Sequence, residues 1–138
     1  MKKVLIIENI HKSGIKLLES RNDFSFEIAE NLEINFLKKK LKDCDAVSLK
    51  VSNFDKELIE AAKKLKIISR HGVGYDNIDI GYAKKRNITI TITANANAAT
   101  VAEHVFFMML NISKGNILYD KCVREGNFLK REELRLTK

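Results

Sequence analysis

Residues 65–92, LKIISRHGVGYDNIDIGYAKKRNITITI, decide the fold. The segment opens with an isoleucine-rich apolar run, Leu65–Arg70, and closes with a second, Ile88–Ile92, both typical of strands. Between them, a turn with two glycines leads to Asp79, a favourable N-cap for a short helix ending near Arg86. A helix between two such strands predicts a parallel βαβ unit, because parallel neighbours need a long crossover connection.

The chain before this segment repeats the same alternation. We expect three more strands, at Lys3–Glu8, Phe24–Ala29 and Asp45–Val51, and three more helices, at His11–Ser20, Leu32–Leu41 and from Ser52 to about Lys64. Ser52, followed by Asp55 three residues later, resembles a capping box. Strict alternation with right-handed crossovers predicts an α/β fold with a doubly wound, parallel, five-stranded sheet.

The chain changes character after the fifth strand. From Ala98 onward, apolar residues recur at helical spacing, and Gly115 separates this helix from a second one that runs to Gly126. The charged tail Lys130–Lys138 has few apolar residues to bury. We therefore expect one domain at 1–97 and, at 98–138, a helical extension that leads to a further domain.

Composition narrows the class of protein. The chain is 45% hydrophobic and carries a formal net charge of +7. No apolar run approaches the ~18 residues of a membrane span, and the N-terminus lacks the apolar core of a signal peptide, so a cytoplasmic location is expected. The lysine run at 38–42 is interpreted as the solvated face of a helix, without any nucleic-acid-binding motif. Cys44 and Cys122 are widely spaced and predicted to be reduced structural thiols.

Candidate site residues follow the strands, because ligands of open α/β sheets bind at the carboxyl ends of strands. Gly72-Val73-Gly74 is not a dinucleotide fingerprint, since Asn77 stands where the third glycine of G-x-G-x-x-G would fall. Two glycines around Val73 permit either a nest of backbone N–H groups for a carboxylate or a plain turn.

Two other positions face the same edge of the predicted sheet. Lys50 ends the third strand and is either a carboxylate contact or an exposed lysine. Asn97 is an N-cap for the long helix, whose positive end would favour an anion. His71 is the one histidine in a candidate loop, and we predict neither a catalytic Ser–His–Asp or Cys–His set nor a metal site.

Three motifs, in order, resemble the N-terminal region of the D-isomer-specific 2-hydroxyacid dehydrogenases, a family that includes phosphoglycerate dehydrogenases, glyoxylate/hydroxypyruvate reductases and D-lactate dehydrogenases. They are Leu65–Asp79 (LKIISRHGVGYDNID), Asn97–His104 (NAATVAEH, similar to N-A-E-S-V-A-E-H) and Val123–Phe128 (VREGNF, similar to V-R-E-G-x-W). Two departures stand out. Thr91–Asn97 reads TITANAN where the family has T-N-T-P-G-A-N, and Lys50 stands where the family often has an arginine, which loses bidentate carboxylate geometry.

The resemblance implies a flavodoxin-like substrate-binding domain followed by helices that pass into a Rossmann cofactor domain. It implies that Lys50, Gly72, Val73, Gly74 and Asn97 bind the substrate, and that Val73 and Val101 line the nicotinamide pocket of NAD or NADP. The family's cofactor fingerprint and catalytic Arg, Glu and His lie beyond the part that Lys138 matches, so we expect no catalytic residue and no turnover from this chain alone.

By the same resemblance, the partners are a small 2-hydroxy or 2-oxo acid, a Rossmann domain in cis or as a split partner, and a second copy in a homodimer. Two other functions stay open. The chain is alternatively a stand-alone carboxylate-binding or interaction module without catalysis, or a basic, nucleic-acid-associated protein, although we expect neither nucleic acid nor membrane as a partner.

Overall fold

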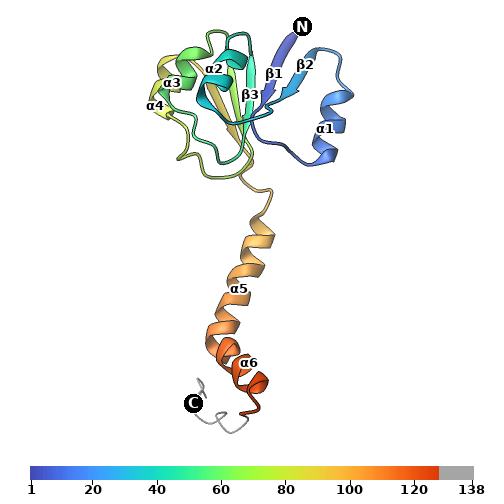
Figure 1. The fold of residues 1–138 in the computed structure, drawn as a ribbon, viewed down its shortest axis with the longest axis vertical. Coiled ribbons are helices and arrows are strands. Elements are labelled where there is room, and N and C mark those ends of the chain that lie inside the picture. The colour runs from blue at the N-terminus through green and yellow to red at the C-terminus, as the bar shows by residue number, and fades with distance from the viewer. Residues whose placement is uncertain (128–138) are drawn as a thin grey trace. The chain divides into compact units, whose positions relative to one another are not determined.

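A parallel five-stranded sheet organises the first part of the computed structural model, which describes residues 1–127 of the chain. The strands are β1 (Lys2–Ile6), β2 (Phe24–Ile28), β3 (Ala46–Leu49), β4 (Ile67–Arg70) and β5 (Thr89–Ile92). Their order is β2-β1-β3-β4-β5, and every neighbouring pair is parallel (Figure 1). The predicted α/β fold is therefore confirmed, and the strand order reverses between β1 and β3.

Four helices connect these strands. They are α1 (Lys12–Glu19), α2 (Ile34–Leu41), α3 (Lys56–Ala61) and α4 (Ile80–Lys85). The β1–β2 connection runs across the sheet in the opposite direction to the other three, so with right-handed crossovers α1 lies on one face of the sheet and α2, α3 and α4 lie on the other (Figure 1).

The caps of α3 and α4 show where local sequence decides a helix start. Asp79 caps α4 as predicted, because its carboxylate accepts a hydrogen bond from the N–H of Tyr82 at 2.8 Å. The predicted start of α3 at Ser52 is wrong: Asp55 is the N-cap, and its carboxylate accepts from the N–H of Leu58 at 3.1 Å. Ser52 instead belongs to the loop that follows β3.

The core lies between the sheet and the α2–α3–α4 layer. Its strand residues alternate along the chain, as Val47 and Leu49 do in β3, because every second side chain of a strand faces the same side. Phe54, in the β3–α3 loop, is completely buried among them. The free thiol of Cys44 lies in this core too, where burial raises its pKa, so it is an unreactive structural thiol.

The second compact unit begins at Asn97, and the first is Met1–Ala96. It contains α5 (Ala98–Lys114) and α6 (Asn116–Arg124), separated by Gly115, whose φ of 59° and N–H bonds to the carbonyls of Asn111 and Ile112 end α5. No residue of α5 is buried. Among the described helices, none combines the length and the hydropathy that a membrane crossing would require. Phe128 of the third motif and the tail Lys130–Lys138 lie outside the described residues.

Candidate anion site at the carboxyl edge of the sheet

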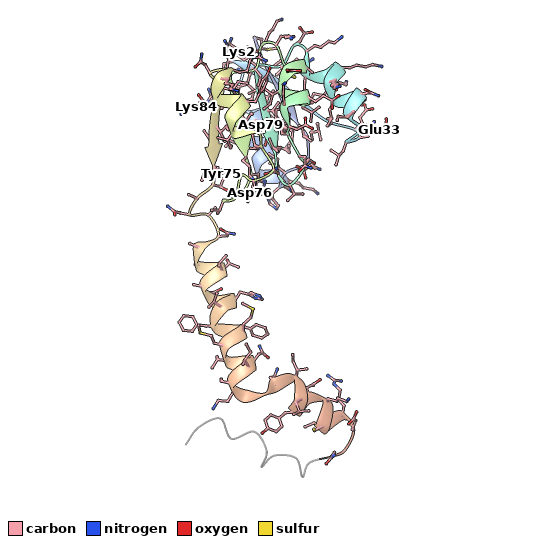
Figure 2. The ribbon with its side chains drawn as sticks, turned by 90° about the vertical axis from the view of Figure 1, so that its left-hand side faces the viewer. Lys2, Glu33, Tyr75, Asp76, Asp79 and Lys84 are labelled. Carbon is pink, nitrogen blue, oxygen red and sulfur yellow. The ribbon has the colours of Figure 1, made fainter. Side chains whose placement is uncertain are left out.

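The candidate site lies where β1, β3 and β4 end. These strands are neighbours, and the register pairs Ile6 with Ser48 and Leu49 with Arg70. The segments after the three strands therefore meet at one edge of the sheet, beside the reversal of strand order where open α/β sheets bind ligands. Figure 2 shows Tyr75 and Asp76, of the loop after β4, at the opposite end of the first unit from Lys2.

The loop after β4 presents backbone N–H groups without acceptors. Within residues 1–127, no protein atom accepts a hydrogen bond from the N–H of Val73 or Gly74. The N–H of Gly72 is engaged by the carbonyl of Arg70 at 3.0 Å, and the carbonyl of Gly72 accepts from Thr93 at 3.0 Å. Gly72 thus fixes the loop through its φ of 150°, a value that favours glycine, while Val73 and Gly74 offer the free donors.

Arg70 places a positive charge against this loop. Its Nη1 donates a hydrogen bond to the carbonyl of His71 at 2.9 Å. The guanidinium fills the space beside Gly72, where a Cβ would lie 1.4 Å from Nη1. Its Nε is buried and has no hydrogen-bond partner among the described residues. In the sequence, Arg70 stands out only as the end of a strand, although a basic residue at a carboxyl strand end is a signal for an anion site.

Lys50 follows β3 rather than ending it, because the strand stops at Leu49. The N–H of Lys50 donates to Glu8 Oε2 at 2.6 Å and not to a neighbouring strand. The same carboxylate accepts from the N–H of Val51 at 3.1 Å and of Ser52 at 3.3 Å. Partial burial by itself would raise the pKa of Glu8, but these three backbone hydrogen bonds together lower it below its ordinary value.

Asn77 connects the Lys50 loop to the glycine loop. Its Nδ2 donates to the carbonyl of Ser52 at 2.7 Å and to that of Lys50 at 3.3 Å. The N–H of Phe54 donates to the carbonyl of Asn77 at 2.7 Å, and the N–H of Asp79 to the carbonyl of Phe54 at 3.1 Å. In the sequence, Asn77 is notable only because it stands where a third glycine is missing, and Glu8 only because it ends a predicted strand.

The edge also carries a carboxylate that opposes anion binding. A Cβ on Gly74 would lie 3.4 Å from Asp76 Oδ2, so this acidic group is next to the glycine loop. The guanidinium of Arg70, which lies against the same loop, carries the opposite charge and would offset Asp76. Among the described residues, no group of three or more His, Cys, Asp or Glu side chains forms a metal site.

Asn97 and Val101 belong to the second unit. The carbonyl of Asn97 accepts the first helical hydrogen bond, from the N–H of Val101 at 2.9 Å. Asn97 is the N-cap of α5 as predicted, but its side chain makes no capping hydrogen bond. Val101 is 52% exposed, and Val73 of the first unit is 44% exposed. No G-x-G-x-x-G occurs in the chain.

Comparison with known proteins identifies the family of the chain. Residues 4–132 match the family described as D-isomer specific 2-hydroxyacid dehydrogenase, catalytic domain. A glyoxylate reductase of Pyrococcus horikoshii is 38% identical over 133 residues, which cover 94% of this chain and 39% of the relative. A putative 2-hydroxyacid dehydrogenase of Staphylococcus saprophyticus is 37% identical over 132 residues, which cover 93% of this chain and 41% of the relative.

Solved structures agree with these relatives. A D-lactate dehydrogenase from Aquifex aeolicus, complexed with NAD and lactic acid, superposes with a TM-score of 0.80 at 28% identity, over 95% of this chain and 40% of that one. A 3-phosphoglycerate dehydrogenase from Entamoeba histolytica with bound NAD+ gives 0.68 at 27% identity, over 82% and 39%. The chain thus spans about 40% of the length of the proteins it matches. It belongs to the D-isomer-specific 2-hydroxyacid dehydrogenase family and corresponds to that family's catalytic domain.

Proposed function

We propose that this chain provides the carboxylate-binding part of an NAD(P)-dependent oxidoreductase that interconverts small D-2-hydroxy acids and 2-oxo acids. The observation that carries the proposal is that the N–H groups of Val73 and Gly74 have no acceptor among residues 1–127, with the guanidinium of Arg70 against the same loop. Relatives named as glyoxylate reductases and a D-lactate dehydrogenase supply the substrate class.

The chemistry of the loop suits a carboxylate. An ionised carboxylate has two acceptor oxygens, and backbone N–H groups donate charge-assisted hydrogen bonds to it. Such bonds contribute about 1.5–3 kcal/mol each. Arg70 and Lys50 add positive charge that offsets Asp76, and Asn97 is proposed as a further substrate contact from the start of α5.

The cofactor would meet the chain at apolar surface. NAD or NADP supplies or accepts the hydride when bound, and the exposed side chains of Val73 and Val101 are the proposed contacts for its nicotinamide ring. Because the chain contains no G-x-G-x-x-G, we propose that a Rossmann domain, in cis or as a split partner, binds the phosphates, and that the chain by itself does not turn over.

The exposed surface of α5 supports the need for a partner. Apolar side chains surround this helix, and a helix that is apolar on every side is normally buried. They include Val101, Val105, Phe106, Phe107, Met108, Met109, Leu110 and Ile112, each at least 38% exposed. A cofactor domain and a second copy in a homodimer are the proposed coverings.

Titration with oxalate, a stable analogue of a 2-oxo acid, tests the site. We expect the backbone amide signals of residues 72–75 to shift saturably in two-dimensional NMR spectra, and neutral oxamide to leave them in place. Arg70→Gln and Lys50→Gln should each weaken oxalate binding roughly three- to tenfold, since each removes a charge worth about 1 kcal/mol or more to the anion. Lys84→Gln, in the last turn of α4, is the matched control and should bind like the parent chain.

The alternatives give different results in the same experiments. Unmoved amides at 72–75 in the parent chain would reject the carboxylate site. Oxalate binding without glyoxylate-dependent NADH oxidation, after fusion to the cofactor domain of the Pyrococcus horikoshii relative, would favour a stand-alone binding module. Salt-sensitive retention of DNA on filters would favour the nucleic-acid-associated protein.

A further inference from the structure

The β3–α3 loop holds a second anion nest, and the chain already occupies it. Three consecutive N–H groups, those of Lys50, Val51 and Ser52, converge on the carboxylate of Glu8 at 2.6, 3.1 and 3.3 Å. Successive backbone N–H groups that point into one concavity form a binding site for an anionic oxygen. The site is therefore complete without any external ligand.

We propose that Glu8 is a positioning residue that occupies this nest in place of a substrate carboxylate, and so directs the substrate to the neighbouring glycine loop. The inference rests on the proposed function of residues 72–74. Glu8 lies two residues beyond β1, and β1 pairs directly with β3, so its side chain reaches the segment after β3 across a single strand spacing.

Two adjacent nests at one sheet edge would otherwise compete for the same substrate carboxylate. The N–H groups of Val73 and Gly74 have no acceptor within residues 1–127, whereas those of Lys50, Val51 and Ser52 have Glu8. A carboxylate fixed to the protein is present at high effective concentration, so a dissolved anion cannot displace it easily. One nest is closed and the other stays open.

The hydrogen bonds of Asn77 make the closed nest relevant to the open one. The Asn77 side chain donates to the carbonyls of Lys50 and Ser52, and the backbone carbonyl of Asn77 accepts from the N–H of Phe54. The peptide groups of the Lys50 loop are thus held by Glu8 on their N–H side and by Asn77 on their carbonyl side. Asn77 follows the glycine loop by three residues, so a shift of the Lys50 loop is transmitted to residues 72–74.

The test compares Glu8→Ala with the parent chain by amide NMR. In the parent chain, oxalate should shift the amide signals of residues 72–75 and leave those of Val51 and Ser52 in place; in the variant it should shift Val51 and Ser52 as well, because these donors lose their acceptor. Oxalate affinity at residues 72–75 should fall about tenfold, the factor expected from losing roughly 1.4 kcal/mol of positioning. Added acetate should return the amide signals of residues 50–52 of the variant towards their parent positions, and should leave those of the parent chain unmoved.

Asp45→Asn is the matched control. The Asp45 carboxylate accepts a backbone hydrogen bond from the N–H of Lys3 at 2.9 Å, but it precedes β3 and lies at the amino edge of the sheet. Its loss should lower stability without opening an oxalate site at residues 50–52. If Glu8→Ala does not fold, Glu8→Gln is the substitute, because glutamine keeps one acceptor oxygen. Oxalate should compete with the Gln side-chain oxygen for the nest and shift the amide signals of residues 50–52 weakly.

The outcomes separate this inference from the proposed function. If residues 50–52 respond to neither acetate nor oxalate in a folded Glu8 variant, the nest does not select anions and the inference is overturned. If residues 72–75 of the parent chain ignore oxalate while acetate restores the Glu8→Ala signals, the nest stands and the proposed substrate site falls.

Discussion

Replacing Gly72 with alanine tests the geometry of the glycine loop most directly. The new Cβ would lie 1.4 Å from Arg70 Nη1 and 2.6 Å from Cζ, so the guanidinium must leave its place against the loop. The backbone at this position has a φ of 150°, which L-residues rarely adopt. The substitution therefore acts on both the loop conformation and the charge beside it.

The magnitude follows from these two effects. A residue forced into such a sparsely populated region costs about 1–3 kcal/mol. Displacing Arg70 also removes the hydrogen bond to the carbonyl of His71, which contributes about 1 kcal/mol. We expect the free energy of unfolding to fall by about 2–4 kcal/mol, and oxalate affinity at residues 72–75 to fall by at least tenfold.

Urea denaturation and oxalate titration measure the two effects separately. Gly126→Ala is the matched control, because Gly126 has a φ of 69° but no atom within 4 Å of a new Cβ. It should cost about 1–2 kcal/mol and leave oxalate affinity unchanged. A Gly72→Ala chain as stable as the parent, or one that binds oxalate equally well, would show that neither the conformation of Gly72 nor the position of Arg70 supports the site.

Three further predictions concern stability. Phe54→Ala should lower the free energy of unfolding, measured by urea denaturation, by about 3–5 kcal/mol because the Phe54 side chain is completely buried. Phe106 of α5 is 67% exposed, so Phe106→Ala should change the free energy of unfolding by less than about 0.5 kcal/mol. Backbone hydrogen bonds that outweigh partial burial lower the pKa of Glu8, and the N–H of Lys3 and the ammonium of Lys2 lower that of Asp45. The two carboxylates should therefore stabilise the fold above about pH 5, and this stabilisation should disappear as the pH falls through the lowered pKa values. A urea midpoint that stays constant from pH 6 to pH 3 would contradict this. Gly81→Ala should raise the free energy of unfolding by about 0.5–1 kcal/mol, because alanine favours the helix and the new Cβ meets Asp79 Oδ1 at an ordinary 3.6 Å; a destabilised variant would contradict it.

The layout of the sheet follows from local sequence. Runs rich in isoleucine and threonine, such as Ile67–Arg70 and Thr89–Ile92, are strands because β-branched side chains favour extended backbone, and Asp79 caps α4 because its carboxylate reaches the N–H of Tyr82. The predicted start of α3 at Ser52 is wrong because Ser52 and Asp55 are both good N-cap residues, and long-range contacts decide which of them caps the helix. The Ser52 carbonyl and N–H are engaged by Asn77 and Glu8, which hold it in the loop.

Only the part of the site that is formed by consecutive residues could be predicted from the sequence. The glycine loop is visible in the sequence because Gly72 and Gly74 flank Val73, and it stays a prediction as a substrate site. Glu8 lies 42 residues from Lys50, and only the pairing of β1 with β3 brings them together. Arg70 was overlooked because the direction of a side chain at a strand end depends on the following turn.

The exposed apolar side chains around α5 have a practical consequence for the purification of this chain. A contiguous apolar surface of more than a few hundred Å² drives non-specific association in water. Preparations should bind hydrophobic dyes such as ANS, cluster as concentration rises, and become better behaved with mild detergent. Burial of α5 against another protein surface should reverse each of these behaviours.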